Sequence, residues 1–219
     1  MTDQLSFLPD ADILTRDDAE LKLEALIGQD LRPLAETFEV TVYRDGQRNK
    51  GWAGQVVECY LGQRPNSTKA ADFGDWELKV VPFVVNRQGD LKPKESMAIA
   101  MFTQAEIESQ EFENSHLIEK LRRLLVVARL YVDSTESESM VLGLATFDLV
   151  DDELLGQIRA DYEEIRWFVR NEGIDAVTGH IGQVVQPRVK GGAGAGRGGH
   201  CFYARPSFVA RLFGLTDDA

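Results

Sequence analysis

A short apolar segment that carries charge at alternate positions most constrains the fold of this chain. Residues 76–85 read WELKVVPFVV, a pattern typical of a buried β-strand, yet Glu77 and Lys79 interrupt it at its start. Side chains two residues apart on a strand point to the same side, so these two groups are predicted to stand together on one face. Asp72 and Asp75 come just before them. The strand is therefore predicted to begin at a cluster of charged groups.

Helices and strands alternate along the rest of the chain. Apolar spacing predicts a helix from Arg16, a second after Pro33, a third over 49–63 with Glu58 beside its polar stripe, and a long one over 151–173. Strands are predicted at 96–103, 124–132 and 146–150, with an exposed acidic loop at 133–140. Residues 184–214 predict a strand, a glycine-rich loop, another strand and a short helix. Strands interleaved with helices indicate a mixed α/β or α+β sheet domain.

Length and composition indicate one globular domain. The chain has 219 residues, of which 43% are hydrophobic and 27% charged, enough to bury a substantial core. No apolar run approaches the roughly 20 residues that a membrane helix needs, so no membrane partner is expected. The N-terminus lacks the basic and apolar regions of a targeting peptide, and a cytoplasmic location is expected. Cys59 and Cys201 are then expected to be free thiols.

The net charge of −12 argues at first against nucleic acid as a partner, because phosphate binding uses Lys and Arg. The charge is unevenly placed, however, since residues 176–211 contain no Asp or Glu. Five basic residues lie in that stretch: Arg188, Lys190, Arg197, Arg205 and Arg211. A net-acidic protein can carry one basic face that binds polyanions. A loop-rich region that merely lacks acids is the alternative, and charge alone leaves both open.

The glycine-rich loop within residues 188–199 has a formal match to a nucleotide-binding motif. GAGRGG, residues 194–199, fits G-x-G-x-x-G, but a strand rather than a helix follows it and the chain soon ends, which excludes a dinucleotide fold. A phosphate-binding loop of the G-K-[ST] type is excluded because the sequence contains no Gly-Lys-Ser or Gly-Lys-Thr. The loop is instead predicted to be basic and mobile from Arg188 through Arg197, with glycines that let its backbone approach a ligand or become ordered upon binding.

The segment ADFGDWELK, residues 71–79, suits metal-dependent hydrolysis of a phosphodiester. Mg²⁺ takes carboxylate oxygens, polarises a phosphoryl oxygen and acidifies the attacking water. A lysine beside that water can orient or deprotonate it, or stabilise the charge that builds on phosphorus. The alternative is an ordinary exposed strand face with an ion pair. Zinc chemistry is not indicated, because the three histidines and two cysteines show no zinc-ligand spacing.

Several motifs in one order resemble the MutH mismatch-repair endonucleases and the related GATC-cutting type II restriction enzymes, of the PD-(D/E)xK nuclease class. The resemblance covers residues 50–213. It rests on KGWAGQVVECYLG (50–62), DFGDWELKVVP (72–82), SHLIEKLRRLL (115–125), DYEEIRWFV (161–169), QPRVKG (186–191) and CFYARPSF (201–208). It implies a restriction-endonuclease-like fold, a mixed sheet flanked by helices, with two lobes that form a DNA cleft.

The resemblance also implies roles for individual residues. Asp72 and Glu77 are implied as metal ligands, Lys79 as the catalytic lysine, Glu58 as an accessory carboxylate at the metal and Lys120 as a second active-site lysine. Implied DNA contacts are Lys50, Tyr203 and the reading-loop residues Gln186, Arg188 and Lys190, and Arg197 of the basic loop joins them as a prediction. The Asp72–Glu77 spacing is two residues shorter than expected, so Asp75 is an alternative ligand. Gln186 stands where the family tends to have arginine, so a GATC target is not implied.

Together these observations predict a magnesium-dependent, sequence-specific endonuclease of duplex DNA. A single endonuclease domain over 1–219 would contain an acidic helical segment over 1–39, a catalytic lobe over 50–135 and a second lobe over 140–219 with a DNA-reading loop at 186–205. Restriction and mismatch-repair nicking both remain open. A MutL-type repair partner and a monomer or weak dimer fit the resemblance. The alternative function is a DNA-binding homologue of the same fold that does not cut.

Overall fold

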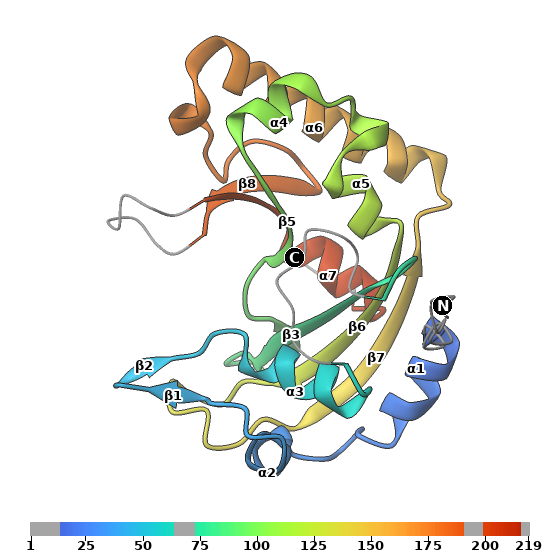
Figure 1. Cartoon of the computed structure of the whole chain (residues 1–219), viewed down its shortest axis with the longest axis vertical. Coiled ribbons are helices and arrows are strands. Elements are labelled where there is room, and N and C mark those ends of the chain that lie inside the picture. The colour runs from blue at the N-terminus through green and yellow to red at the C-terminus, as the bar shows by residue number, and fades with distance from the viewer. Residues whose placement is uncertain (1–13, 64–72, 191–198, 216–219) are drawn as a thin grey trace, which may run out of the picture.

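The computed structural model describes residues 14–63, 73–190 and 199–215 (Figure 1). Two short 3₁₀ turns, Phe112–Asn114 and Ile174–Ala176, accompany the regular elements. In chain order the elements are α1 (Arg16–Glu24), α2 (Leu31–Thr37), β1 (Tyr43–Arg44), β2 (Gln47–Arg48), α3 (Trp52–Tyr60), β3 (Glu77–Val85), β4 (Leu91–Pro93), β5 (Met97–Phe102), α4 (Gln104–Ser109), α5 (His116–Leu121), β6 (Arg123–Leu130), β7 (Val141–Asp148), α6 (Asp152–Glu172), β8 (Val185–Val189), β9 (His200–Ala204) and α7 (Pro206–Leu212).

Within the described residues the strands form two sheets and a small hairpin. The main sheet has the order β4-β3-β6-β7, in which β3 and β6 are parallel and the other neighbours antiparallel. The small sheet has the antiparallel order β5-β9-β8, and β1 and β2 form the hairpin. A mixed sheet flanked by helices was the predicted fold class, and the structure confirms it.

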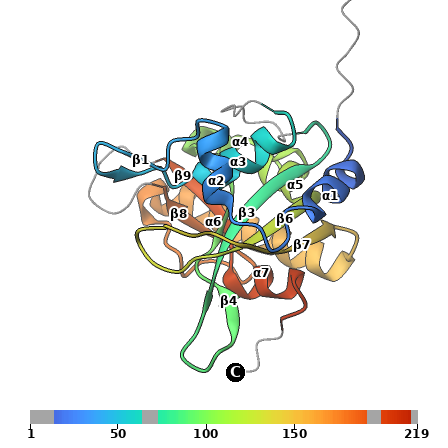
Figure 2. The ribbon, with the colours of Figure 1, turned by 90° about the horizontal axis from the view of Figure 1, so that it is seen from below.

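Strand β6 shows why the main sheet is covered on both faces. Its residues 124–127 are all apolar and fully buried. Because side chains alternate along a strand, Leu124 and Val126 enter one hydrophobic core while Leu125 and Val127 enter another. The second core contains residues of α1, α2 and α3, and Figure 2 shows these helices on one side of the main sheet with α7 on the other. The first core joins the main sheet to the small sheet and α6.

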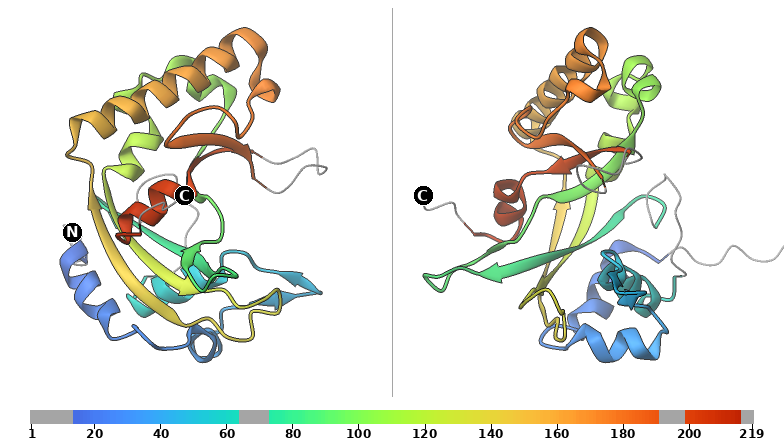
Figure 3. Two further views of the ribbon diagram at one scale, coloured as in Figure 1. Left: turned by 180° about the vertical axis from the view of Figure 1, so that it is seen from behind. Right: turned by 90° about the vertical axis from the view of Figure 1, so that its left-hand side faces the viewer.

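The two sheets lie at an angle with helices outside them. Figure 3 shows α4 and α6 covering the outer side of the small sheet, while the main sheet and α1, α2 and α3 form the opposite part of the molecule. The chain passes between the sheets, since β5 belongs to the small sheet and β6 returns to the main one. The residue bounds of the two predicted lobes stay a prediction.

The longest helix follows its sequence signals closely. Asp151 accepts a hydrogen bond from the backbone N–H of Leu154 at the start of α6, and Gly173 follows its last residue with φ +88°. Ser115 caps α5 in the same way, and the chain then enters β6 directly. The expected helix over 49–63 is α3, and Gly62 follows it with φ +88°. The predicted helices over 151–173 and 49–63 are thereby confirmed.

Three local expectations were wrong. The second helix begins at Leu31, not after Pro33, because Asp30 caps it and a proline is tolerated in a first turn whose N–H groups have no helical partner. The strand expected at 146–150 is longer, Val141–Asp148, since it pairs along the whole of β6. The acidic loop at 133–140 is not uniformly exposed, because Glu136 and Ser139 are buried in it.

None of the helices in the described ranges is long and apolar enough to span a membrane.

Candidate active site

A cleft of about 890 Å³ opens between the main sheet and the small sheet. One wall is formed by the start of β3 and by α3, and the other by β5 and β9. Seven of the predicted site residues line this one cleft, although they come from segments far apart in sequence: Lys50, Glu58, Glu77, Lys79, Lys120, Lys190 and Tyr203.

Glu77 is the buried carboxylate of this cleft. It is the first residue of β3, and its side chain is only 1% exposed. Its Oε1 accepts a hydrogen bond from the Lys79 ammonium group on the same strand, and another of 2.9 Å from Nζ of Lys120. The predicted pairing of alternate residues is therefore present. The alternative of an exposed strand face does not hold, because the ion pair is buried in a cleft.

Lys120 reaches Glu77 through the connection of α5 to β6. It lies in the last turn of α5, and β6 then runs parallel to β3 with Leu124 opposite Glu77. This arrangement brings the end of α5 to the same end of the sheet as the start of β3. Lys120 is itself buried, and a buried ammonium group requires a partner such as the Glu77 carboxylate.

Helix α3 brings a second carboxylate to the cleft. Gly51, Gly54 and Glu58 lie on one side of this helix at spacings of three and four residues, and all line the cleft. Trp52 and Val56 point the other way and are fully buried in the core. Glu58 and Glu77 thus belong to one cleft, as the resemblance implied. Gly51 and Gly54 leave the cleft side of α3 without side chains at its N-terminal end, before Glu58.

Of the two candidate aspartates before β3, the structure describes only Asp75. Asp72 lies outside the described residues. The side chain of Asp75 is 67% exposed, pairs with Arg123 and does not line the cleft. In the part of the chain that the structure describes, no group of three or more His, Cys, Asp or Glu side chains is arranged to hold a metal ion.

The face of the small sheet toward the cleft carries the predicted base-reading residues. Gln186 lies opposite Tyr203 and Arg188 opposite Cys201 in the β8–β9 register, so the four side chains share one face. Tyr203 and Cys201 line the cleft, and burial raises the pKa of both the phenol and the thiol. Arg188 is exposed, and Arg197 lies outside the described residues.

Gln186 is not presented to solvent. Its side chain is buried, and its Nε2 donates a hydrogen bond of 2.6 Å to Oγ of Ser96, which lines the cleft. Its Oε1 has no hydrogen-bond partner among the described residues. The base-contact role of Gln186 therefore stays a prediction. It requires Gln186 to break its hydrogen bond with Ser96 and turn toward the cleft.

Not every basic residue of the acid-free stretch 176–211 faces the cleft. The Arg205 guanidinium donates to the backbone carbonyls of Gly179 and Gly182, at 3.0 and 2.7 Å, and so holds a turn of the chain. Residues missed by the sequence analysis do line the cleft, notably Glu95, Ser96 and His116. His116 stood in the quoted SHLIEKLRRLL segment, but nothing in its local pattern indicated which way its ring would face.

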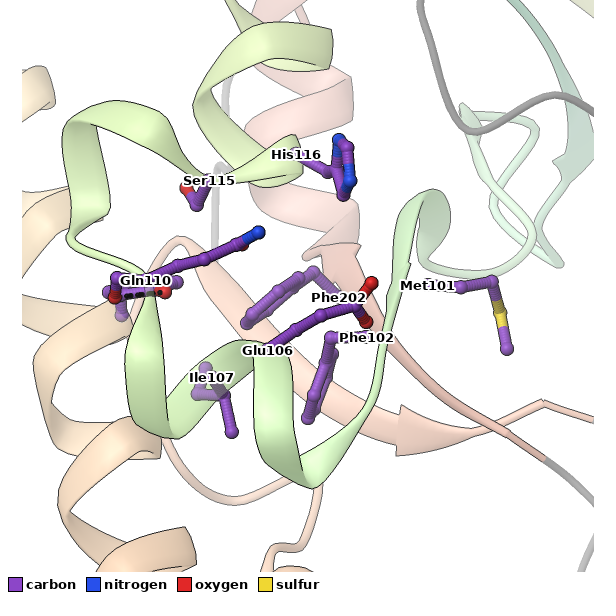
Figure 4. Close-up of a pocket in the computed structure, with 9 residues that line it drawn as sticks. Met101, Phe102, Glu106, Ile107, Gln110, Ser115, His116 and Phe202 are labelled. Atoms are coloured by element: carbon purple, nitrogen blue, oxygen red, sulfur yellow. Dashed lines mark hydrogen bonds between the residues drawn. The ribbon is translucent and has the colours of Figure 1, made fainter.

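A smaller cavity lies behind the cleft wall, between α4, α5 and the small sheet (Figure 4). Its volume is about 10 Å³, the space of a single water molecule. Phe102 and Phe202 pack against each other at its side, with ring centroids 4.2 Å apart. The cavity is too small for a substrate, so the large cleft is the candidate site.

Comparison with known proteins identifies the family of this chain. The family model described as "DNA mismatch repair enzyme MutH" matches residues 61–161. The DNA mismatch repair protein MutH of Haemophilus ducreyi is 31% identical over 192 residues, covering 86% of this chain and 80% of that protein. The MutH of Yersinia pseudotuberculosis serotype IB is 31% identical over 174 residues, covering 77% and 73%. That of Histophilus somni strain 2336 is 27% identical over 212 residues, covering 89% and 93%.

A solved complex of the restriction endonuclease MvaI with its cognate DNA covers 83% of this chain and 95% of that one, with a TM-score of 0.38 and 10% identity, a likeness too low to bear on the fold. The sheets, the cleft and the sequence relatives define the class of protein, a site-specific deoxyribonuclease with a restriction-endonuclease-like fold. The chain belongs to the MutH family. The resemblance carried by its motifs is confirmed.

Proposed function

We propose that this protein is a magnesium-dependent endonuclease that recognises a short sequence in duplex DNA and hydrolyses a phosphodiester bond to leave a 5′-phosphate. The observation that carries the proposal is the convergence of Glu77, Lys79 and Lys120, with Glu58, in the cleft between the two sheets. Carboxylates and lysines gathered in one cleft are the groups that such hydrolysis requires.

The carboxylates of the cleft fit a hard divalent cation. Glu77 and Glu58 would hold Mg²⁺, and Asp72 is proposed as the further ligand. When bound, Mg²⁺ supplies Lewis-acid stabilisation of the charge on the phosphoryl oxygens and lowers the pKa of water. The oxygen-only donor set favours Mg²⁺ over softer metals, which prefer sulfur or imidazole ligands.

Lys79 would act on the proton of the attacking water, and Lys120 on the charge of the scissile phosphate. Lys79, on the strand next to Glu77, would orient the attacking water through its ammonium group, or accept the proton of that water at Nζ from its neutral amine form. Lys120, buried against the same carboxylate, would stabilise the charge that develops at the scissile phosphate. Both lysines are carried by regular elements, β3 and α5, which would limit the reorganisation needed at the moment of reaction.

The second wall of the cleft would contact the DNA. Lys190 after β8, and Lys50 before α3 on the opposite wall, suit phosphate contacts, and Tyr203 on β9 suits contact near the bases. Arg188 and Arg197 are proposed as further contacts, and Gln186 as a base contact once it leaves Ser96. A net charge of −12 with these basic groups at one cleft fits a single DNA-binding face.

The relatives carry the name of a DNA mismatch repair protein, which favours nicking in mismatch repair as the biological role. A MutL-type partner, action as a monomer or weak dimer and a cytoplasmic location are part of this proposal. The target sequence is left unassigned, because Gln186 replaces an expected arginine.

The test is cleavage of plasmid DNA by the full chain with Mg²⁺. Unmethylated, hemimethylated and fully methylated plasmids are incubated with the wild type and with Glu77→Ala and Lys79→Ala, and the ends are sequenced. Cleavage at one sequence with 5′-phosphate ends is expected from the wild type, and a loss of at least about 100-fold from each variant, the usual scale for removing a positioned proton-transfer group.

The matched control is Glu153→Ala, which removes an exposed carboxylate from the first turn of α6, outside the cleft lining. It is expected to cut like the wild type. Intact plasmid under every methylation state, with DNA binding retained and falling steeply with salt, would instead indicate the binding-only homologue.

A further inference from the structure

We propose that Glu136 is a positioning residue that holds the start of α3, and thereby Glu58 and Lys50, at the wall of the cleft. This inference rests on the proposed function, because it concerns how the ligand and DNA-contact groups of that site are placed. Glu136 lies in the loop between β6 and β7, which the sequence predicts to be exposed, yet only 1% of its side chain is accessible.

The Glu136 carboxylate joins three separate elements. Its Oε1 accepts from Nη1 of Arg48 on β2 at 2.7 Å, and its Oε2 lies 3.2 Å from Nη2 of Arg129 on β6. The same Oε2 accepts a hydrogen bond of 2.5 Å from Nε1 of Trp52, the first residue of α3. The hairpin, the main sheet and the helix thus meet at one buried carboxylate.

Trp52 is held on its ring faces as well as at its nitrogen. The guanidinium of Arg129 lies 5.4 Å from the ring centroid and that of Arg32 lies 5.7 Å from it. The side chain is fully buried. Its position is therefore fixed by a hydrogen bond and by two cations, and a buried aromatic residue fixed in this way also fixes the backbone that carries it.

The start of α3 has no side-chain cap of its own. Its N-cap is Gly51, which offers no side-chain acceptor to the first turn. The contact of Trp52 with Glu136 anchors this helix start through a side chain, beside the hydrogen bond of 3.1 Å from the Gly51 backbone N–H to Oδ1 of Asn49. Because Lys50, Gly54 and Glu58 line the cleft from this helix and the residue before it, a shift at Trp52 would move that wall.

The backbone of Glu136 adopts a strained conformation. Its φ is +45°, in the left-handed region that residues other than glycine rarely adopt. Tyr43 on β1 also donates to the carbonyl of Ser134 in the same loop, so the loop is fastened to the hairpin at two points. A strained residue that is held by its side chain suits a role in positioning a neighbouring site.

The experiment compares Glu136→Gln and Trp52→Phe with Glu138→Gln, a control that neutralises an exposed acid of the same loop. Trp52→Phe keeps the Glu136–Arg129 pair and removes the indole N–H together with one ring of a buried side chain, and thermal unfolding reports the packing part of its effect separately. Mn²⁺ binding without DNA is measured by titration calorimetry, plasmid cleavage is measured against Mg²⁺ concentration, and folding is followed by thermal unfolding.

Glu136→Gln and Trp52→Phe are expected to weaken Mn²⁺ binding, and to raise the Mg²⁺ concentration for half-maximal cleavage, by roughly 10-fold to 100-fold, as for residues that orient metal ligands. Glu138→Gln is expected to match the wild type. Variants that melt earlier but titrate like the wild type would overturn the inference while leaving the proposed function intact. A wild type that neither binds Mn²⁺ nor cuts would overturn the proposed function and this inference with it.

Discussion

At the residue scale, two lysines from different elements share one oxygen of Glu77. Lys79 comes from the same strand and Lys120 from α5, and all three side chains are largely buried. Both ammonium groups thus line the cleft beside the Glu77 carboxylate, where a phosphate group would lie. The burial of these charges raises their mutual interaction well above that of a surface pair.

Lys120→Met is expected to slow cleavage by about 100-fold or more, because it removes a positioned charge from the scissile phosphate. Stability is expected to stay within about 1 kcal/mol of the wild type, since an apolar side chain of similar length often replaces a buried ion-pair member that leaves its partner another cation. Single-turnover cleavage and urea unfolding measure the two effects. Lys92→Met, on the exposed side of β4, is the control, and an unchanged rate for Lys120→Met would contradict its role.

Asp72→Asn and Asp75→Asn are expected to separate the two candidate ligands. Asp75 is exposed and paired with Arg123, so its loss is expected to cost less than about 1 kcal/mol and to leave cleavage unchanged. Asp72→Asn is expected to abolish cleavage at ordinary Mg²⁺ concentrations. Cleavage rates across a Mg²⁺ series measure both variants. The reverse pattern would show that Asp75 turns away from Arg123 to serve the metal.

At the element scale, the small sheet depends on how α6 and β8 are joined. Asp161 of α6 is buried and accepts backbone hydrogen bonds of 2.8, 2.7 and 2.8 Å from Gln183, Val184 and Val185. Gly182 precedes them with φ +77° and lies against the carbonyl of Val185. This junction sets where β8 begins and therefore where its cleft-facing residues lie.

Gly182→Ala is expected to destabilise the protein by at least about 2 kcal/mol, because its Cβ would overlap the Val185 carbonyl at a backbone angle that favours glycine. Gly156→Ala is the matched control. Gly156 lies in α6 with open space around it, so alanine there is expected to stabilise by about 0.5–1 kcal/mol. Urea unfolding measures whether the free energy of unfolding falls in Gly182→Ala and rises in Gly156→Ala. Equal effects would contradict the geometry of the α6–β8 junction.

The elements that sequence predicts well are those whose signals are local. The amphipathic pattern of residues 151–173 and the apolar run of β6 need only their own neighbours, and α6 and β6 are found where these signals place them. The pairing of β5 with β9 joins segments about a hundred residues apart, and no local pattern encodes such a register. That pairing is what turns Tyr203 toward the cleft.

The candidate site likewise has one part that the local sequence predicts and another part that depends on how distant elements pack. Strand alternation alone predicted that Glu77 and Lys79 would stand together, and the structure places them so. The approach of Lys120 and Glu58 was implied only by the family resemblance, because it depends on how α5 and α3 dock against β3. Glu136 gave no signal at all, since an acid within a polar loop looks exposed until the tertiary structure surrounds it with arginines and an indole.

At the scale of the whole molecule, one continuous core holds the two sheets at a fixed angle. Val81 and Phe83 of β3 share this core with Ile99 of β5 and Phe202 of β9. The cleft therefore lies between two walls that belong to one packed unit, rather than between independent lobes. A shared core of this kind would keep the proposed metal ligands of one wall in register with the proposed DNA contacts Lys190 and Tyr203 of the other, as catalysis on a bound duplex requires.

The central claim is that Glu58 and Glu77 bind one divalent cation beside Lys79 and Lys120 in a cleft that holds DNA. A crystal structure of the full chain with a cognate duplex and Mn²⁺ tests it directly through the anomalous signal of the metal. The account predicts a peak with both carboxylates at roughly 2 Å, next to a phosphate of the duplex. A metal bound elsewhere, or DNA seated away from the cleft while Glu77 keeps only its lysines, would contradict it.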